Sequence, residues 1–253
     1  MNSIFTIAAR ELRSLFLSPL AWTILAVVQL VMAYFFLILL DRFVMAQPQL
    51  AQMENPPGVT EAVVAPLLDT AGIVLLLIAP MLTMRLISEE RRNQTLPLLF
   101  SAPVSMTEII LGKYLGILGF FMLIVALTAL MPLSLYFGTS LDTGMLLSGF
   151  MGLTLLLASI AAIGLFMSSL TAQPTVAAIS TFGVLLLLWI LDAAATTGGD
   201  VGGSVLSYLS ILRHYQPMLT GAFKSVDVVY YLLFITTFIV LSIRRLDSYR
   251  LQH

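Results

Sequence analysis

The sequence has no cysteine, only two histidines, and only 10% charged residues among its 253 positions. Without cysteine, the chain has no disulfide framework, no thiol nucleophile and no thiolate metal ligand. The histidines, His214 and His253, are not part of a cluster, so no metal site is expected. Because soluble domains average about 25% charged residues, this composition excludes a soluble core.

The chain also lacks a phosphate-binding loop and a strong charge imbalance. No Gly-x-x-x-x-Gly-Lys-Ser/Thr pattern occurs, so the chain does not bind ATP by that route. Its net charge of −1 gives no indication of nucleic-acid binding. The apolar runs are almost free of the ionisable groups that ion-coupled transporters place near mid-bilayer. These absences argue against an enzyme. They disfavour a secondary transporter, which stays an alternative function beside a non-transporting membrane scaffold for outer-side partners.

Hydrophobic residues make up 59% of the chain, and its mean hydropathy is +1.02. A membrane-spanning helix needs about 20 apolar residues. We therefore predict an all-α, polytopic membrane protein, a single transmembrane domain over residues 1–253. Its six spans are the apolar runs 20–40, 66–87, 106–137, 145–170, 175–194 and 228–243. The spacing of Ser105 and Glu108 predicts a capping box at the start of the third span, whose first turns, with Glu108 and Lys113, are expected to protrude from the bilayer.

Three of the segments outside the spans differ in composition. Residues 1–18 carry apolar side chains on one helical face and Arg10 and Arg13 on the other, which predicts an amphipathic interfacial helix; a simple lead-in to the first span is a compatible alternative. Residues 41–65 are read as a polar loop. Residues 195–227 are too polar to span, and we expect short helices there that dip back into the interface.

The placement of lysine and arginine predicts the orientation. One side of the membrane would hold nine basic residues: Arg10, Arg13, Arg85, Arg91, Arg92, Lys113, Arg244, Arg245 and Arg250. The other side would hold Arg42, Arg213 and Lys224. Both termini are therefore predicted to be cytoplasmic.

The densest charge cluster lies in residues 88–104, between the second and third spans. Glu89, Glu90, Arg91 and Arg92 precede a short apolar stretch, and Thr95 has the side chain to cap a short helix there. This segment either fills a groove on a partner protein or lies on the lipid surface while its arginines set the topology. The residues alone leave both interpretations open. Gly112 and Gly116, four apart in the third span, match the close-packing motif of membrane helices. They either mark a contact between spans or reflect only how common glycine is in such helices.

Four stretches carry a resemblance to a known family. They are Arg-Glu-Leu-Arg-Ser-Leu-Phe-Leu-Ser-Pro-Leu from Arg10, Glu-Glu-Arg-Arg-Asn-Gln-Thr-Leu-Pro-Leu-Leu-Phe-Ser-Ala-Pro-Val-Ser from Glu89, Glu-Ile-Ile-Leu-Gly-Lys-Tyr-Leu-Gly from Glu108, and Val-Asp-Val-Val-Tyr-Tyr from Val226. In this order they resemble the ABC-2 type exporter permeases, most closely the gliding-motility-associated branch. One departure is Pro97, where the family more often has a polar residue that favours a helix.

The resemblance implies a non-catalytic permease subunit in the bacterial cytoplasmic (inner) membrane. It would pair with a second permease copy, identical or related, and with two ABC ATPase subunits that bind ATP and magnesium; this chain itself would bind no cofactor. Residues 88–104 would be the coupling helix, whose ATPase contacts carry over to Glu89, Glu90, Arg91, Arg92, Thr95, Leu96 and Leu99. Residues 1–18 would be the connecting helix, represented by Arg10, Glu11, Arg13 and Phe16, and residues 195–227 would form outer re-entrant helices. Either a substrate is exported, or force passes to outer-side auxiliary proteins.

Overall fold

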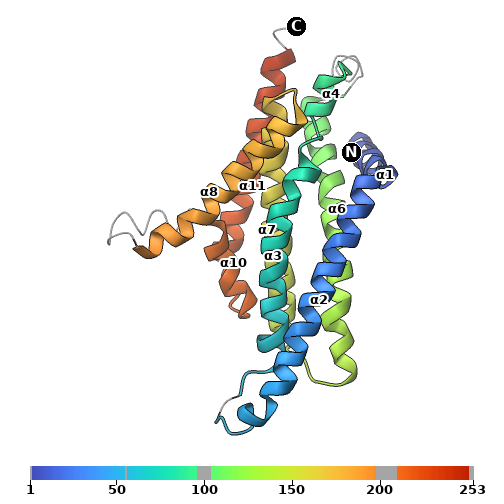
Figure 1. The fold of residues 1–253 in the computed structure, drawn as a ribbon. Helices are drawn as coiled ribbons and strands as arrows, with labels where there is room; N and C mark the ends of the chain where they lie inside the picture. Colours follow the sequence, from blue (N-terminus) through green and yellow to red (C-terminus); the bar gives the residue numbers. More distant parts are fainter. Residues whose placement is uncertain (1, 55, 96–103, 198–209, 251–253) are drawn as a thin grey trace.

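The computed structural model describes residues 2–54, 56–95, 104–197 and 210–250 (Figure 1). Most of these residues are helical, and none of them lies in a strand. In chain order the elements are α1 (Asn2–Leu17), α2 (Pro19–Leu50), the π-helical turn η1 (Thr60–Val64), α3 (Ala65–Thr83), α4 (Ser88–Arg92), α6 (Met106–Ser134), the 3-10 turn η2 (Leu135–Phe137), α7 (Thr143–Leu170), α8 (Pro174–Thr197), α10 (Ile211–Leu219) and α11 (Ser225–Arg250).

The described residues contain six helical stretches that are long and apolar enough to cross a membrane. They are Pro19–Leu50, Thr60–Arg92, Met106–Phe137, Thr143–Leu170, Pro174–Leu191 and Ser225–Tyr249. The predicted all-α fold with six membrane-spanning helices is thereby confirmed. Both termini lie toward the same end of the bundle (Figure 1), while the side of the membrane that this end faces stays a prediction.

The first spanning helix is longer than its apolar run. The sequence predicts a polar loop from Asp41, but α2 continues to Leu50 and contains 32 residues. At about 1.5 Å per residue its length is ~48 Å, more than the ~30 Å of the hydrocarbon core. The expected boundary at Asp41 is wrong for the helix, because falling hydropathy marks where side chains become polar and not where the backbone hydrogen bonds end.

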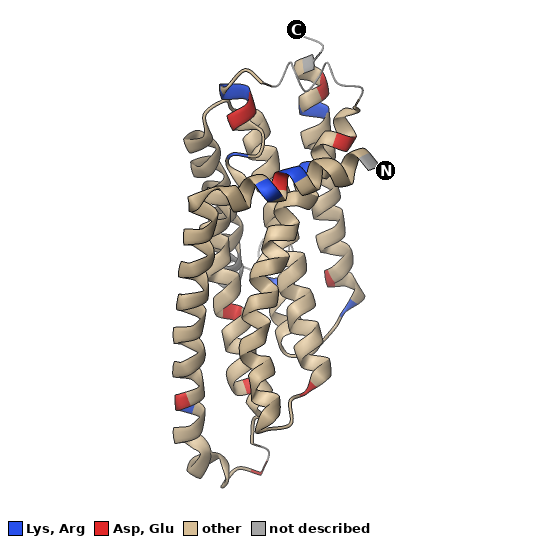
Figure 2. Cartoon of the chain, turned by 90° about the vertical axis from the view of Figure 1, so that its right-hand side faces the viewer, with Lys and Arg blue, Asp and Glu red and all other residues tan. Residues whose placement is uncertain are grey.

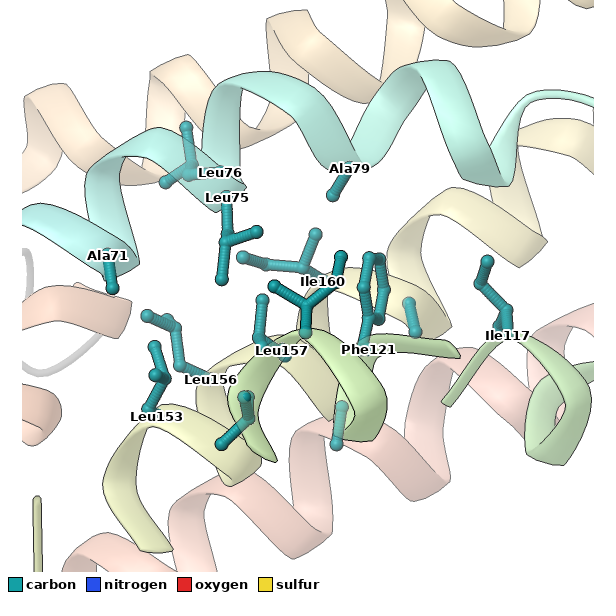
Figure 3. Close-up of a cluster of buried hydrophobic side chains, with 14 of the residues drawn as sticks. Ala71, Leu75, Leu76, Ala79, Ile117, Phe121, Leu153, Leu156, Leu157 and Ile160 are labelled. Carbon is teal, nitrogen blue, oxygen red and sulfur yellow. The ribbon is translucent and has the colours of Figure 1, made fainter. Parts of the chain in front are cut away.

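Helix α7 is the central helix of the bundle, in contact with α3, α6, α8, α10 and α11. Figure 3 shows its side chains Leu157 and Ile160 between Leu75 of α3 and Phe121 of α6, with Leu153 one turn further along α7. All five are buried. In a membrane such contacts stabilise the bundle by close packing, since lipid is as apolar as the core. The remaining helices are arranged around this core.

Helix α10 is the short helix described within the predicted outer segment, of which residues 198–209 lie outside the described residues. Ser210 caps it by accepting a hydrogen bond from the amide of Arg213. Two buried tyrosines attach it to the bundle: Tyr215 donates to the Leu68 carbonyl of α3, and Tyr231 of α11 donates to the Ile211 carbonyl, both at 2.7 Å. Helix α10 is therefore packed among α3, α7 and α11.

Charged residues gather at the end of the bundle that carries α1, α4 and the C-terminal part of α11 (Figure 2), which we call the charged end. Helix α1 lies across the bundle axis there. Its apolar residues Ile7, Leu12, Leu15 and Phe16 pack against the core, whereas Arg10 and Arg13 are exposed. This arrangement suits a helix at a membrane surface.

Candidate functional site

Helix α1 packs closely against the two glycines of α6, Gly112 and Gly116. A Cβ atom added to Gly112 would lie 2.7 Å from the Ile7 side chain, and one added to Gly116 would lie 2.7 Å from Cβ of Glu11. The predicted close-packing motif therefore contacts the crossing helix α1, and the expectation of a contact between two spans is wrong. The spacing marks a smooth helix face, but it carries no information about which helix covers that face.

Lys113 lies on α6 beside these glycines and is buried under α1 and α4. Its Nζ atom is 3.0 Å from Oε2 of Glu11 and 2.9 Å from Oε1 of Glu90, and its side chain is 4% exposed. Arg10 adds a longer contact to Glu90, at 3.8 Å. The prediction that the first turns of α6 protrude from the bilayer stays a prediction. Lys113 itself does not face solvent, because two carboxylates from distant parts of the chain pair with it inside the protein. The sequence around Lys113 does not predict these partners, because both lie far from it along the chain.

The capping box expected at the start of α6 is confirmed. The Ser105 hydroxyl accepts from the Glu108 amide at 3.2 Å, and the Glu108 carboxylate accepts from the Ser105 amide at 2.9 Å. The hydroxyl of Ser3 in α1 donates to the same carboxylate. Glu108 thus joins the start of α6 to the start of α1.

The helix is interrupted between α3 and α4, and hydrogen bonds from a neighbouring helix stabilise the interruption. The helix leaves its regular course after Thr83, and the hydroxyl of Ser168 on α7 accepts from the amides of Ile87 and Ser88, both at 3.0 Å. The same hydroxyl donates to the Met84 carbonyl at 2.9 Å. Backbone groups freed by a break must find partners inside a membrane protein. Ser168 supplies them and sets where α4 begins.

Arg91 attaches α4 to the opposite side of the bundle from Glu90. Its Nη1 atom donates to the Ser169 carbonyl of α7 at 2.8 Å. Its guanidinium lies over the ring of Tyr249 in α11, 4.5 Å from the ring centre, within the range of cation–π attraction. Glu90 and Arg91, two of the predicted ATPase contacts, therefore hold α4 to its own chain.

The outward side of α4 carries Glu89 and Arg92, which are exposed, as are Asn93, Gln94 and Thr95. Helix α4 ends in a Schellman motif: the Thr95 amide donates to the Glu90 carbonyl at 3.0 Å, and the Gln94 amide donates to the Arg91 carbonyl at 3.3 Å. Gln94 has a φ of 56°. Thr95 thus closes α4, and the short helix that it was predicted to cap lies outside the described residues. The predicted contacts Leu96 and Leu99 lie outside the described residues.

In the connecting-helix set, Phe16 faces inward. Its ring centroid is 5.6 Å from those of both Trp22 and Phe120, and its carbonyl accepts from the Trp22 indole at 2.7 Å. Glu11 faces Lys113, while Arg10 and Arg13 face outward. The predicted set therefore divides between packing inside the protein and exposure at its surface.

Outside the charged end, His214 and Asp227 form a buried pair, with Nδ1 and Oδ1 2.6 Å apart. The His214 ring stacks on Tyr230 with centroids 4.0 Å apart. Among the described residues there is no group of three or more histidine, cysteine, aspartate or glutamate side chains that could hold a metal ion. We assign this pair to the attachment of α10 to α11.

Comparison with known proteins assigns nearly the whole chain to one family. A family model described as "ABC-2 family transporter protein" matches residues 5–249 of the 253. No curated protein matches the chain. The matched region contains α4, the site around Lys113 and the six candidate spans, so fold and site fall within one family assignment. The chain belongs to the ABC-2 family of transporter proteins.

Proposed function

We propose that this chain is the permease subunit of an ABC exporter and that α4 couples it to a separate ATPase subunit. The family is one of membrane transport components, and membership implies an ABC ATPase as partner. The observation that carries the proposal is that one face of α4 is bonded to the bundle while its other face is exposed. Glu90 and Arg91 grip the bundle, while Glu89 and Arg92 stay exposed for a partner.

Two branches would transmit movement of α4. Through Glu90 and Lys113 it reaches α6 and α1, and through Arg91 it reaches α7 and α11. A rigid connection needs anchors on both sides, because a helix of five residues has little stability of its own. In this proposal ATP and magnesium bind to the partner, and this chain converts hydrolysis into helix movement.

Co-purification tests the coupling. We expect the tagged protein, extracted in mild detergent from its native cells, to bring down an ABC ATPase in equal amounts. The double reversal Glu89→Lys with Arg92→Glu should lose the ATPase and keep the unfolding temperature, because both side chains are exposed. The matched control is Asp41→Lys with Arg42→Glu, an exposed acid–base pair on α2. Equal ATPase recovery from both double variants would overturn the proposal.

The absence of native cysteine allows a direct version of this test. A single thiol introduced by Arg92→Cys, carrying a benzophenone maleimide, should crosslink to the ATPase on illumination. The same reagent at Arg42→Cys should not. Recovery of the ATPase crosslink from Arg42→Cys alone would place docking at the other end of the bundle.

We propose that the charged end faces the cytoplasm of a bacterial cell, as the excess of basic residues there predicts. A membrane-impermeant maleimide added to intact cells should label Arg42→Cys and leave Arg92→Cys unlabelled until the cells are opened. The reverse labelling pattern would invert the orientation and remove α4 from the reach of a cytoplasmic ATPase.

Export and force transmission remain two forms of this function, and two permease copies with two ATPase subunits are the proposed assembly. The apolar character of the spans favours a lipid-like or hydrophobic cargo, or no cargo. Resemblance to the gliding-motility branch favours force transmission. ATPase activity stimulated by added hydrophobic substrate would support export, whereas outer-side proteins that co-purify with the complex would support force transmission.

A further inference from the structure

A cavity of about 270 Å³ lies at the charged end, between α1, the start of α2, the end of α3 and α4. One part of its wall is polar, with Ser14, Ser18, Arg85 and Glu89. Another part is apolar, with Leu17 and Met81 among its residues. Leu17 is 76% exposed and Met81 46% exposed, so the apolar part opens outward.

The residues around the cavity have features typical of the membrane–water interface. Ser18 is the N-cap of α2, where the crossing helix α1 turns into the first spanning helix. Trp22, one turn into α2, is 56% exposed, and tryptophan is enriched at the membrane–water interface. The apolar wall around Leu17 and Met81 therefore adjoins acyl chains, while Arg85 and Glu89 lie at the polar boundary.

The cavity carries one positive and one negative side chain, which together match a zwitterionic ligand. Arg85 and Glu89 are both exposed, and the described residues provide no ion pair for either one. Glu11, which also lines the cavity, already pairs with Lys113 at 3.0 Å. One cation and one anion therefore remain to face a ligand. An arginine binds phosphate with two parallel hydrogen bonds, and a carboxylate pairs with an ammonium group.

We propose that this cavity binds the headgroup of an aminophospholipid, such as phosphatidylethanolamine. Arg85 bonds the phosphate, Glu89 pairs with the ammonium group, and the acyl chains pass over Leu17 and Met81. The apolar wall selects an intact lipid over a soluble phosphate ester. A phosphatidylglycerol molecule satisfies Arg85 but leaves Glu89 without a cation beside an anionic phosphate. Glu89 also belongs to the proposed docking surface, so the two proposals are separated by the residues that they do not share: Arg85, which lines the cavity, and Arg92, which does not.

Native mass spectrometry tests it on the purified protein with any ATPase subunit retained. The protein is equilibrated with equal amounts of phosphatidylethanolamine and phosphatidylglycerol that have the same acyl chains. We expect phosphatidylethanolamine to be retained about two- to fivefold over phosphatidylglycerol, the ratio that one partly exposed ion pair provides. Arg85→Gln should reduce retention of both lipids. Glu89→Gln should remove the preference while keeping the bound phosphate.

Two control variants separate this result from charge loss in general and from docking. Arg13→Gln removes an exposed cation of α1 that does not line the cavity, and Arg92→Gln removes an exposed α4 residue of the proposed docking surface. Both should keep the lipid preference. Equal retention of the two lipids by the wild type, or loss of preference in Arg92→Gln, would overturn the proposal. Displacement of the bound lipid by millimolar glycerophosphoethanolamine would show that the headgroup alone suffices and overturn the choice of an intact lipid.

Discussion

The ammonium group of Lys113 lies 2.9 Å from a carboxylate oxygen of Glu90, and together they join the third spanning helix to α4. The same ammonium group is 3.0 Å from Glu11 of α1. One buried cation thus pairs with two acids on two other helices, and Oε2 of Glu90 is buried without a hydrogen-bond partner. The balance of charge at this junction depends on Lys113.

Replacement of Lys113 by methionine should destabilise the protein strongly. The change keeps the bulk of the side chain but leaves Glu11 without its cation and Glu90 with only the 3.8 Å contact to Arg10. Removal of one partner from a buried ion pair costs about 3–5 kcal/mol. Thermal unfolding in detergent, followed by tryptophan fluorescence, measures the loss. The triple variant Lys113→Met, Glu11→Gln, Glu90→Gln should recover much of the stability. A triple variant no more stable than Lys113→Met alone would contradict this electrostatic account.

Ser168→Ala should loosen the break between α3 and α4. The change removes the hydroxyl that accepts from the amides of Ile87 and Ser88, and each unsatisfied buried group costs about 1–3 kcal/mol. Hydrogen–deuterium exchange should show faster exchange at these two amides. Ser180→Ala on α8 is the matched control, because that hydroxyl donates only within its own helix. Unchanged exchange at Ile87 and Ser88 would contradict the assignment.

Gly164→Ala should separate α3 from α7. A Cβ atom at Gly164 would lie 2.1 Å from Oγ1 of Thr83, a contact that cannot form without movement of a helix. Overpacking of this kind typically costs about 1–3 kcal/mol, and a lower unfolding temperature would record it. Gly183→Ala on α8 adds a methyl group into open space and should have little effect. The double variant Gly164→Ala, Thr83→Gly should recover stability if the clash is the cause.

Gln94→Gly should stabilise the end of α4. Gln94 has a φ of 56°, in the left-handed region that costs a residue with a side chain about 1–2 kcal/mol and costs glycine little. We expect a small rise in unfolding temperature and slower exchange of the Thr95 amide, which closes the Schellman motif. Asn93→Gly, one residue earlier at a φ of −83°, lacks this benefit and should lower stability. A fall in stability for Gln94→Gly would contradict the strain.

The residues of α4 illustrate how far local patterns reach. Its charge cluster and position between two spans were enough to predict a functional segment, but the division of labour within it was not predictable. Glu90 and Arg91 face inward because they contact Lys113 and Tyr249. These partners lie on helices far away along the chain, so a pattern within α4 does not reveal the contacts. A run of acids and bases in the sequence has no distinguishable inner and outer face. Lys113 was missed as a site residue for the same reason.

Hydropathy alone accounts for the number of spanning helices, because a membrane span is a local requirement of about 20 apolar residues. Local capping likewise accounts for the start of α6, since Ser105 and Glu108 are three residues apart. The contacts that define the charged end are different: Gly112 meets Ile7, Lys113 meets Glu11 and Glu90, and Ser168 meets Ile87. Each joins residues that lie far apart along the chain, so only the packing of the helices brings these residues together and determines which charges are buried and which remain exposed.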